Sequence, residues 1–451
     1  MATKAKKGSR ASVRSTGTDD TGTGAPGLDC PVQRLIDAAL EHPQGHTGRY
    51  IAIMREDAEG DTEAVMSNSF AATSANSRDF GTRGFAMDEI SGADSLVLNT
   101  LGMAVLGGSA ADAARESMTR SGDSFGTAAE LPYVLEPETI EWVLIDPASY
   151  LMGFRAASDR IATDLLGQPV PSQFEPAPAD VTAAAGGMTW GLSATRVGAS
   201  TATGRGIRVA ILDTGLDLGH PDFAGRRILA QSFIAGETPQ DVNGHGTHVT
   251  GTACGPRVPA TGGNRYGIAH ECEILVGKVL SNAGAGPGLG IVMGIDWALA
   301  NGAHIINMSL GSPAAAANLK YTQAGKRALT RGALIVAAAG NDNAPTGQPA
   351  NSPTILSVAS VNSFLQKSGF SNFGKVELAA PGSSIDSSLP RPRRRGFLSG
   401  TSMAAPHVTG IAALHAQATG LRGKALWAHL ESRAKALSLP PQNRGAGLVQ
   451  A

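Results

Sequence analysis

The stretch "GIVMGIDWALANGAHIINMSL", residues 290–310, carries the pattern that decides the fold. Its first part, residues 290–303, has apolar residues at helical spacing, whereas "HIINMSL" (304–310) is a short, nearly continuous apolar run. Residues 318–340 repeat this order, with a helical segment followed by the run "LIVAAAG". Apolar strands that alternate with helices indicate a parallel sheet that is covered on both faces.

Further apolar runs of the same kind lie on both sides of this stretch, at residues 207–212, 273–280 and 355–361. We therefore predict that residues 188–451 form an α/β domain with a doubly wound, mostly parallel sheet. In sheets of this kind, active residues gather at the carboxyl ends of the strands.

Three segments precede this domain. Residues 1–28 contain almost no large apolar residue and are predicted to be disordered. Residues 29–145 are predicted to form a small α+β domain, and residues 146–187, which are rich in Pro, Ala and Gly, a linker, a lid or a cleavage region. The elements expected in the small domain are a helix at 109–122 and strands within 48–56, 95–108 and 130–145.

The composition narrows the class of protein. The 451 residues carry a net charge of −1, which gives no sign of a nucleic-acid or membrane-surface partner. No apolar run approaches the ~18 residues of a membrane span. The basic first residues are not followed by an apolar segment, so no ordinary secretory signal peptide is predicted. We expect a cytoplasmic monomer and leave a non-standard export route open.

Three short motifs place reactive side chains at a strand end and at two helix starts. Asp213 directly follows the run "IRVAIL". His245 lies between glycines in "NGHGTHVTGT", and Ser402 lies in "SGTSMAAP". A helix start carries unpaired N–H groups and the positive end of the helix dipole, and both favour an oxygen that becomes negative.

This set of side chains suits nucleophilic catalysis by a serine. A serine hydroxyl is a weak nucleophile until an imidazole takes its proton, and a buried carboxylate orients that imidazole. We predict that Asp213, His245 and Ser402 meet in one hydrogen-bonded line. Asn341, which follows "LIVAAAG", and the backbone N–H of Ser402 would donate to a developing oxyanion. Taken alone, Asp213 and Asn341 are better explained as turn residues, but the presence of all the partners favours the catalytic interpretation.

In chain order, "ILDTGLDLGHPD", "NGHGTHVTGT", "SLG", "AAAGN" and "GTSMAAPHV" resemble the subtilisin family of serine peptidases. The resemblance covers about residues 188–450 and implies a serine endopeptidase that acts on peptides or proteins. It implies the following roles: Asp213 as orienting acid, His245 as general base, Ser402 as nucleophile and Asn341 in the oxyanion hole.

The resemblance also implies a groove for an extended peptide. Two segments would pair with the substrate as neighbouring strands, and a third would form one wall of the pocket for the residue before the cut. Small residues in that wall leave room for a large side chain. These substrate-binding residues are Gly284, Ala285, Gly286, Ser309, Leu310, Gly311, Ala338, Ala339 and Gly340.

The small domain at 29–145 is similar in pattern to the propeptide of these peptidases, which acts as a folding chaperone and temporary inhibitor. This implies a zymogen that is inhibited by its own N-terminal domain and that cleaves itself within residues 146–187. Two alternatives stay open. One is a dedicated intracellular processing peptidase for one partner protein, and the other is a catalytically silent relative that binds peptides.

No cofactor is expected to be required. Asp222 matches a calcium ligand of many relatives, but the companion loop 254–267 lacks the expected spacing of acidic and amide residues, so calcium is not predicted. His248 follows His245 by three residues without an evident acidic partner, so no metal-binding residue is predicted.

Two features keep more than one interpretation. Cys254 and Cys272 could close a disulfide or remain two buried thiols, depending on the redox compartment. The run "RPRRR" (391–395) is expected to be a solvated loop, with a contact for acidic substrate residues or a self-cleavage site as alternatives.

Overall fold

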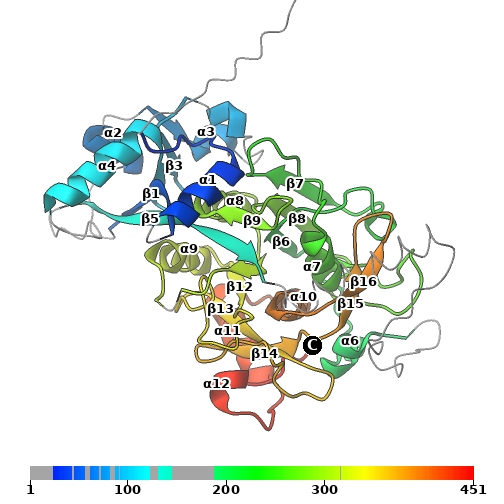
Figure 1. Cartoon of the computed structure of the whole chain (residues 1–451). Helices are drawn as coiled ribbons and strands as arrows, with labels where there is room; N and C mark the ends of the chain where they lie inside the picture. The colour runs from blue at the N-terminus through cyan, green and yellow to red at the C-terminus, as the bar shows by residue number, and fades with distance from the viewer. Residues whose placement is uncertain are drawn as a thin grey trace, which may run out of the picture.

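The computed structural model describes residues 24–42, 45–55, 61–70, 73–81, 87–90, 92–121, 131–144, 187–314 and 316–451. The described elements form two units, which we call the N-terminal unit (residues 24–144) and the C-terminal unit (residues 187–451) (Figure 1). Most of the segment 1–28 that is predicted to be disordered, and all of 146–187 except residue 187, lie outside the described residues. The predicted boundary between a disordered segment 1–28 and a folded domain 29–145 is wrong at Leu28, because the side chain of Leu28 is buried in the core.

The C-terminal unit is built on a seven-stranded sheet with the order β14-β13-β12-β10-β6-β8-β7, in which all neighbouring strands are parallel. This confirms the predicted α/β fold with a parallel sheet. The strands are β6 (Arg208–Asp213), β7 (Ile228–Ser232), β8 (Glu273–Lys278), β10 (Ile305–Met308), β12 (Leu334–Ala338), β13 (Leu356–Val361) and β14 (Leu378–Pro381).

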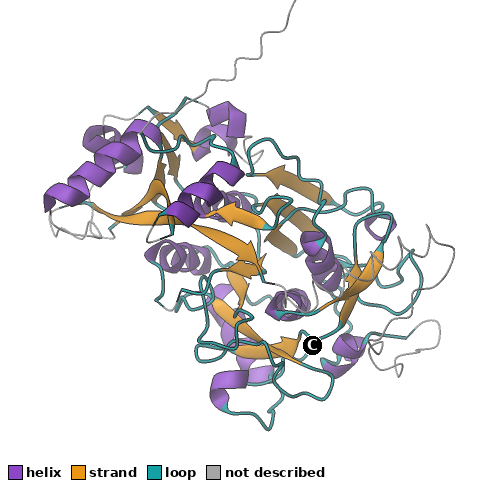
Figure 2. Cartoon of the chain, viewed as in Figure 1, coloured by secondary structure: helices purple, strands orange, loops and turns teal. Residues whose placement is uncertain are grey.

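Helices cover both faces of this sheet (Figure 2). Alternate residues of β6 show why: Val209 and Ile211 pack with α7 and α10, whereas Ala210 and Leu212 pack with α8. Because successive side chains of a strand point to opposite faces of the sheet, one strand contributes residues to two separate cores. The helices of this unit are α6 (Trp190–Ala194), α7 (His245–Cys254), α8 (Gly288–Ala300), α9 (Leu319–Thr330), α10 (Thr401–Thr419), α11 (Gly423–Arg433) and α12 (Pro441–Arg444), with 3-10 turns η3 (Val197–Ala199) and η4 (Pro221–Phe223).

The sequence analysis missed some of the strands at the edges. Edge strand β7 has only one buried residue of five, so it lacks the apolar run of an inner strand. Strand β14 is only four residues long, and the hairpin β15 (Ile385–Ser388) and β16 (Arg395–Leu398) is mostly polar.

The N-terminal unit has a sheet with the order β5-β1-β4-β3-β2, antiparallel except for the pair β2 and β3. Its strands are β1 (His46–Met54), β2 (Ser74–Asn76), β3 (Ser95–Leu98), β4 (Met103–Leu106) and β5 (Tyr133–Val143). Its helices are α1 (Val32–Glu41), α2 (Thr62–Phe70), α3 (Ser77–Phe80), η2 (Met87–Ile90) and α4 (Gly108–Ser121).

The N-terminal sheet is buried on both faces, but only one face is covered by its own unit. Tyr50 and Ala52 of β1 pack with α2 and α4. Ile51 and Ile53, on the other face, belong to the same core as α8 and α9 of the C-terminal unit. The two units therefore share one apolar core across their junction.

Strand β5 connects the two units physically. It runs out of the N-terminal sheet toward β9, as Figure 1 shows. There it continues between two short strands of the C-terminal unit, β9 (Ala285–Pro287) and β11 (Leu310–Gly311). Both pairings are antiparallel. Within the described residues, no helix has the length and apolar character needed to span a membrane.

Candidate active site

The fold brings Asp213 and His245 into direct contact. Asp213 is the last residue of β6, and His245 is the first of α7, where Gly244 caps the helix with a φ of 103° that favours glycine. Asp213 Oδ1 lies 2.7 Å from His245 Nδ1, and both side chains are fully buried. This contact assigns the ring proton to Nδ1, so that Nε2 is the acceptor. His245 Nε2 has no hydrogen-bond partner among the described residues.

Asp241 holds the start of α7 in place, a role that the sequence analysis missed. Its Oδ1 accepts hydrogen bonds from Gly244 N (2.9 Å) and Thr214 Oγ1 (3.0 Å), and its Oδ2 accepts two from Thr247 (2.9 and 2.7 Å). Burial raises the pKa of Asp241, and the donors from Gly244 and Thr247 oppose this shift. The position of Asp241, just before "NGHGTH", is the signal that could have found it.

Ser402 lies in the first turn of α10, as predicted from its motif, but its hydroxyl points elsewhere. Ser402 Oγ donates to the carbonyl oxygen of Ser309 (2.9 Å), and Ser309 Oγ donates to the carbonyl oxygen of Ser402 (2.9 Å). The predicted line is therefore formed between Asp213 and His245, and its second link, from Ser402 to His245, is not formed in this conformation. The Ser309 carbonyl competes for the same hydroxyl proton.

Asn341 lies beside the start of α10 with its amide nitrogen unpaired. Its Oδ1 accepts hydrogen bonds from Thr401 N and Thr401 Oγ1, both at 2.9 Å. This fixes the orientation of the amide group. Its Nδ2 is buried and has no partner among the described residues, so it is an oriented donor without an acceptor.

The segments predicted to bind substrate enclose β5. Val143 pairs with Leu310, Trp142 with Gly311 and Ala285, and Glu141 with Gly286. Val143 N also donates to the carbonyl oxygen of Gly284 (2.9 Å). The chain's own residues 141–143 thus occupy the predicted peptide groove as its middle strand.

Leu144 is the next residue along β5, and the antiparallel register puts it opposite Ser309, which exchanges two hydrogen bonds with Ser402. The Leu144 side chain packs against the core cluster that contains Ala338. Ala339 and Gly340 follow β12, are buried, and Gly340 N donates to Thr401 Oγ1 (3.1 Å). These residues bring the end of β5, the predicted pocket wall and Ser402 to one place.

Asp222 does not fit a calcium ligand here. Its Oδ1 accepts from Thr261 N (2.9 Å), and its Oδ2 accepts from Thr261 Oγ1 (2.8 Å) and from the Tyr266 hydroxyl. Both oxygens of Asp222 are turned toward donors of the loop 254–267, which a cation would have to displace. Among the described residues, no cluster of three or more His, Cys, Asp or Glu side chains is arranged to hold a metal ion.

The other polar features with open interpretations are structural. His248 is buried, and its Nε2 lies 2.9 Å from the carbonyl oxygen of Ile385. Cys254 and Cys272 are buried free thiols in hydrogen-bond contact. That contact, followed in effect by the charge of Arg226, lowers the pKa of Cys272 against the opposing effect of burial.

The loop 391–395, which is predicted to be solvated, is only partly free of contacts with the rest of the protein. Arg391 forms an ion pair with Asp217 (2.8 Å), and Arg395 with Asp386 (2.6 Å). Burial opposes ionisation of Asp217, but the hydrogen bonds from Arg391 outweigh it and hold the pKa of Asp217 below its ordinary range. Two of the four arginines therefore anchor this loop.

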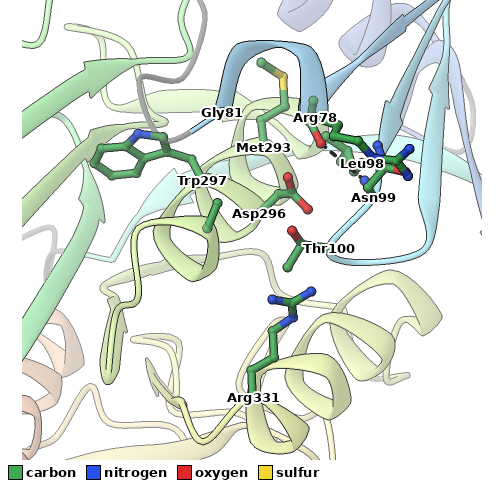
Figure 3. A pocket seen from close by; sticks show the side chains of 11 residues that line it. Arg78, Gly81, Leu98, Asn99, Thr100, Met293, Asp296, Trp297 and Arg331 are labelled. Carbon is green, nitrogen blue, oxygen red and sulfur yellow. Dashed lines mark hydrogen bonds between the residues drawn. The ribbon is translucent and has the colours of Figure 1, made fainter.

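A cavity of about 490 Å3 lies at the junction of the two units (Figure 3). Asp296 of α8 points toward Thr100 in the turn between β3 and β4, and its Oδ1 is buried without a hydrogen-bond partner among the described residues. Burial raises the pKa of Asp296, and Ser77 and Thr100 oppose this rise. The residues lining this cavity include none of the predicted catalytic residues.

Comparison with known proteins matches the C-terminal unit. Residues 204–447 match the model of the subtilase family. The chain is 40% identical over 244 residues to the M-protease of Shouchella clausii (strain KSM-K16), which covers 52% of this chain and 61% of that protein. It is 38% identical over 236 residues to subtilisin-like protease 1 of Trichophyton verrucosum, which covers 50% of this chain and 56% of the relative.

A solved structure agrees with this result. The crystal structure of a cold adapted subtilisin-like serine proteinase superposes with a TM-score of 0.51 at 33% identity, covering 58% of this chain and 96% of that one. The chain thus spans about 56 to 61% of the length of the two curated relatives above, and the residues matched by the family model lie in the C-terminal unit.

Proposed function

From the premise that this chain belongs to the subtilase family, we propose that it is a serine endopeptidase made as a self-inhibited zymogen. The observation that carries this proposal is the buried Asp213–His245 contact, which leaves His245 Nε2 as an unpaired acceptor. Peptides and proteins are the proposed substrates.

Catalysis begins with a change at Ser402. Rotation about its first side-chain bond, between staggered positions, moves Oγ from the Ser309 carbonyl toward His245 Nε2. His245 takes the hydroxyl proton while Oγ attacks the scissile carbonyl carbon, and Asp213 stabilises the resulting imidazolium. A substrate strand that pairs with the segment at Ser309 competes for that carbonyl and favours the rotation.

The negative oxygen that forms in this step meets two donors. Asn341 Nδ2, held by the two hydrogen bonds from Thr401, is one, and the N–H of Ser402 in the first turn of α10 is the other. His245 then returns the proton to the leaving amine, which produces an acyl-enzyme that water hydrolyses through the same groups.

The N-terminal unit is the proposed inhibitor. Strand β5 fills the groove between β9 and β11, and this excludes a second extended peptide. Because Leu144 follows Val143 opposite Ser309, we propose that the bond between Leu144 and Ile145 is cut first. This bond lies directly before the segment 146–187 in which the sequence predicts processing.

Mass analysis of the purified full chain beside Ser402→Ala tests this function. We expect a new N-terminus at Ile145 in the wild type and an intact chain in the variant. A fluorophosphonate probe is expected to label the processed wild type and not the variant. An unlabelled, uncut wild type would instead favour the alternative of a catalytically silent peptide-binding relative.

A dedicated role in processing one partner protein is a narrower version of the same proposal. The groove recognises substrate largely through backbone pairing, as it does with β5, which suits many sequences. A side chain that the groove reads specifically would narrow this range.

A further inference from the structure

The side chain of Glu141 enters the groove at a polar position. Glu141 is fully buried, although it lies on the part of β5 that pairs with β9. Its Oε1 accepts hydrogen bonds from the Tyr321 hydroxyl (3.2 Å) and from Thr139 Oγ1 (3.2 Å). Ser312 lies near this carboxyl group and lowers its pKa, whereas Glu141 Oε2 has no hydrogen-bond partner among the described residues. A carboxyl group is costly to bury without donors, so these contacts matter for docking.

Most of these partners belong to the C-terminal unit and remain there when β5 leaves. Tyr321 and Lys320 lie in the first turn of α9, and Ser312 directly follows β11. Lys320 is fully buried, and its Nζ bonds Thr139 Oγ1 of β5 (3.1 Å) and lies 4.9 Å from the centre of the Tyr321 ring. Without β5, the Lys320 ammonium loses the Thr139 contact.

The electrostatics of this position favour an acid over an apolar side chain. Burial raises the pKa of Glu141, and the charge of Lys320 is the first effect that opposes this rise. The positive end of the α9 dipole adds to the charge of Lys320. An apolar side chain here would leave the Tyr321 hydroxyl without its Glu141 acceptor and would remove the carboxylate charge of Glu141 that Lys320 stabilises.

We propose that Lys320, Tyr321 and Ser312 form a subsite that reads an acidic side chain three residues before the residue whose carbonyl is attacked. The inference rests on the proposed function, and the segment Glu141-Trp142-Val143-Leu144 is its internal example. The substrate class is therefore peptides with glutamate at this position and an apolar residue such as leucine before the cut.

Internally quenched peptides that contain Glu-Trp-Val-Leu before a common leaving segment test the subsite. The comparison peptides carry Leu, Gln or Lys in place of Glu. With self-processed wild-type protein, whose active sites are counted by fluorophosphonate, we expect kcat/KM for the Glu peptide to exceed that for the Leu peptide by about 10- to 100-fold. The Lys peptide is expected to be cut most slowly.

Two substitutions that remove donors with little change of shape sharpen the test. Tyr321→Phe and Lys320→Met are each expected to lower kcat/KM on the Glu peptide and to reduce the ratio of the Glu rate to the Leu rate. Lys326→Met, on an exposed residue of the same helix, is the matched control and should retain the preference.

The outcomes separate the two proposals. Hydrolysis of all peptides at similar rates by the wild type overturns the subsite and leaves the peptidase proposal standing, whatever the variants do. Absence of hydrolysis together with absence of probe labelling overturns both. A preference for Leu over Glu would show that the subsite is apolar and would overturn the inference.

Discussion

In the C-terminal unit, the buried carboxylates of Asp213, Asp222 and Asp241 accept hydrogen bonds from residues of the same unit. On β5 of the N-terminal unit the arrangement is different. Glu138 accepts from Leu289 N (2.7 Å) at the start of α8, and Glu136 accepts from Leu319 N (2.6 Å) at the start of α9. Glu138 also accepts from Thr47 and Arg49 of its own unit. The acids of β5 thus combine donors from their own unit with donors from the other one.

This difference indicates which unit can function without the other. When the N-terminal unit leaves, the contacts around Asp213 and His245 stay unchanged. Glu136, Glu138 and Glu141 leave with it and lose their hydrogen-bond donors in the C-terminal unit. Asp296 is an exception in the C-terminal unit, because Thr100 and Ser77, which oppose the rise of its pKa, come from the N-terminal unit. Figure 3 shows Asp296 beside Thr100. The arrangement is the one that the proposal of a removable N-terminal inhibitor requires.

The largest effect is expected for Glu138→Ala in a Ser402→Ala background, where the chain stays uncut. The substitution leaves Arg49, which is 2.6 Å from Glu138 and 1% exposed, as a buried unpaired charge. It also removes the acceptor of Leu289 N. We expect the free energy of unfolding of the N-terminal unit to fall by about 3–5 kcal/mol, measured as the shift of its denaturant transition.

The control for this prediction removes both charges. In the double variant Arg49→Met with Glu138→Leu, no buried charge is left unpaired, so most of the lost stability should return. A single Glu138→Ala variant as stable as its parent would show that neither the Arg49 ion pair nor the Leu289 N–H contact of Glu138 contributes measurably to the stability of the N-terminal unit.

Asn341→Ala is expected to act on catalysis and leave docking intact. Removal of the oriented Nδ2 donor should lower kcat by about 100- to 1000-fold, a magnitude that comes from the same kind of substitution in subtilisin itself. KM should change little, because the donor acts on the oxyanion and not on bound substrate. Steady-state kinetics of the processed protein give this number.

Asn341→Asp gives a stricter version of the same test. It keeps the shape of the side chain but replaces the donor by an acceptor, so kcat should fall at least as far. A kcat within threefold of the wild type in either variant would remove Asn341 from the proposed oxyanion hole.

The sequence was most informative where a residue's role follows from local order. Apolar runs between helices predicted the inner strands of the C-terminal sheet, and the motifs predicted that Asp213, His245 and Ser402 end or begin elements. The direction of the Ser402 hydroxyl could not be predicted, because it depends on the Ser309 carbonyl, which is 93 positions away.

Local sequence patterns also could not predict the roles of the acidic residues of β5. Glu136, Glu138 and Glu141 have the pattern of polar residues in an ordinary strand, and their partners in the C-terminal unit lie 151 to 184 positions further along the chain. Asp222 matched a ligand pattern, but the donors that occupy it, Thr261 and Tyr266, are known only from the folded loop.

Acid is expected to destabilise the C-terminal unit through a group of its own. Burial, as the largest cause, lowers the pKa of His248 to about 3. The unfolded chain binds this proton near the ordinary histidine value of about 6.5, so the stabilisation is complete above that pH and is lost as the pH falls toward 3. At pH 5 the loss in the free energy of unfolding is roughly 2 kcal/mol relative to its value above pH 6.5.

Denaturant unfolding of the processed protein at several pH values measures this loss. His248→Gln cannot titrate, so its free energy of unfolding should depend on pH less steeply between pH 6.5 and 4. His407, whose pKa burial lowers to about 4, should contribute in the same direction, and the double variant should be flatter still. Equal slopes in wild type and His248→Gln would contradict the assignment.

The smallest effect concerns Asp222, whose donors come from its own unit. Tyr266→Phe removes one of the two donors to Oδ2 and leaves Thr261 Oγ1 at 2.8 Å, so we expect a loss of about 1 kcal/mol, or roughly 2–4 °C in Tm. A chelator should leave the wild-type Tm unchanged, because both Asp222 oxygens already accept hydrogen bonds. If calcium instead raised the wild-type Tm by several degrees and Asp222→Asn abolished the rise, this carboxylate would prefer a cation to its present donors.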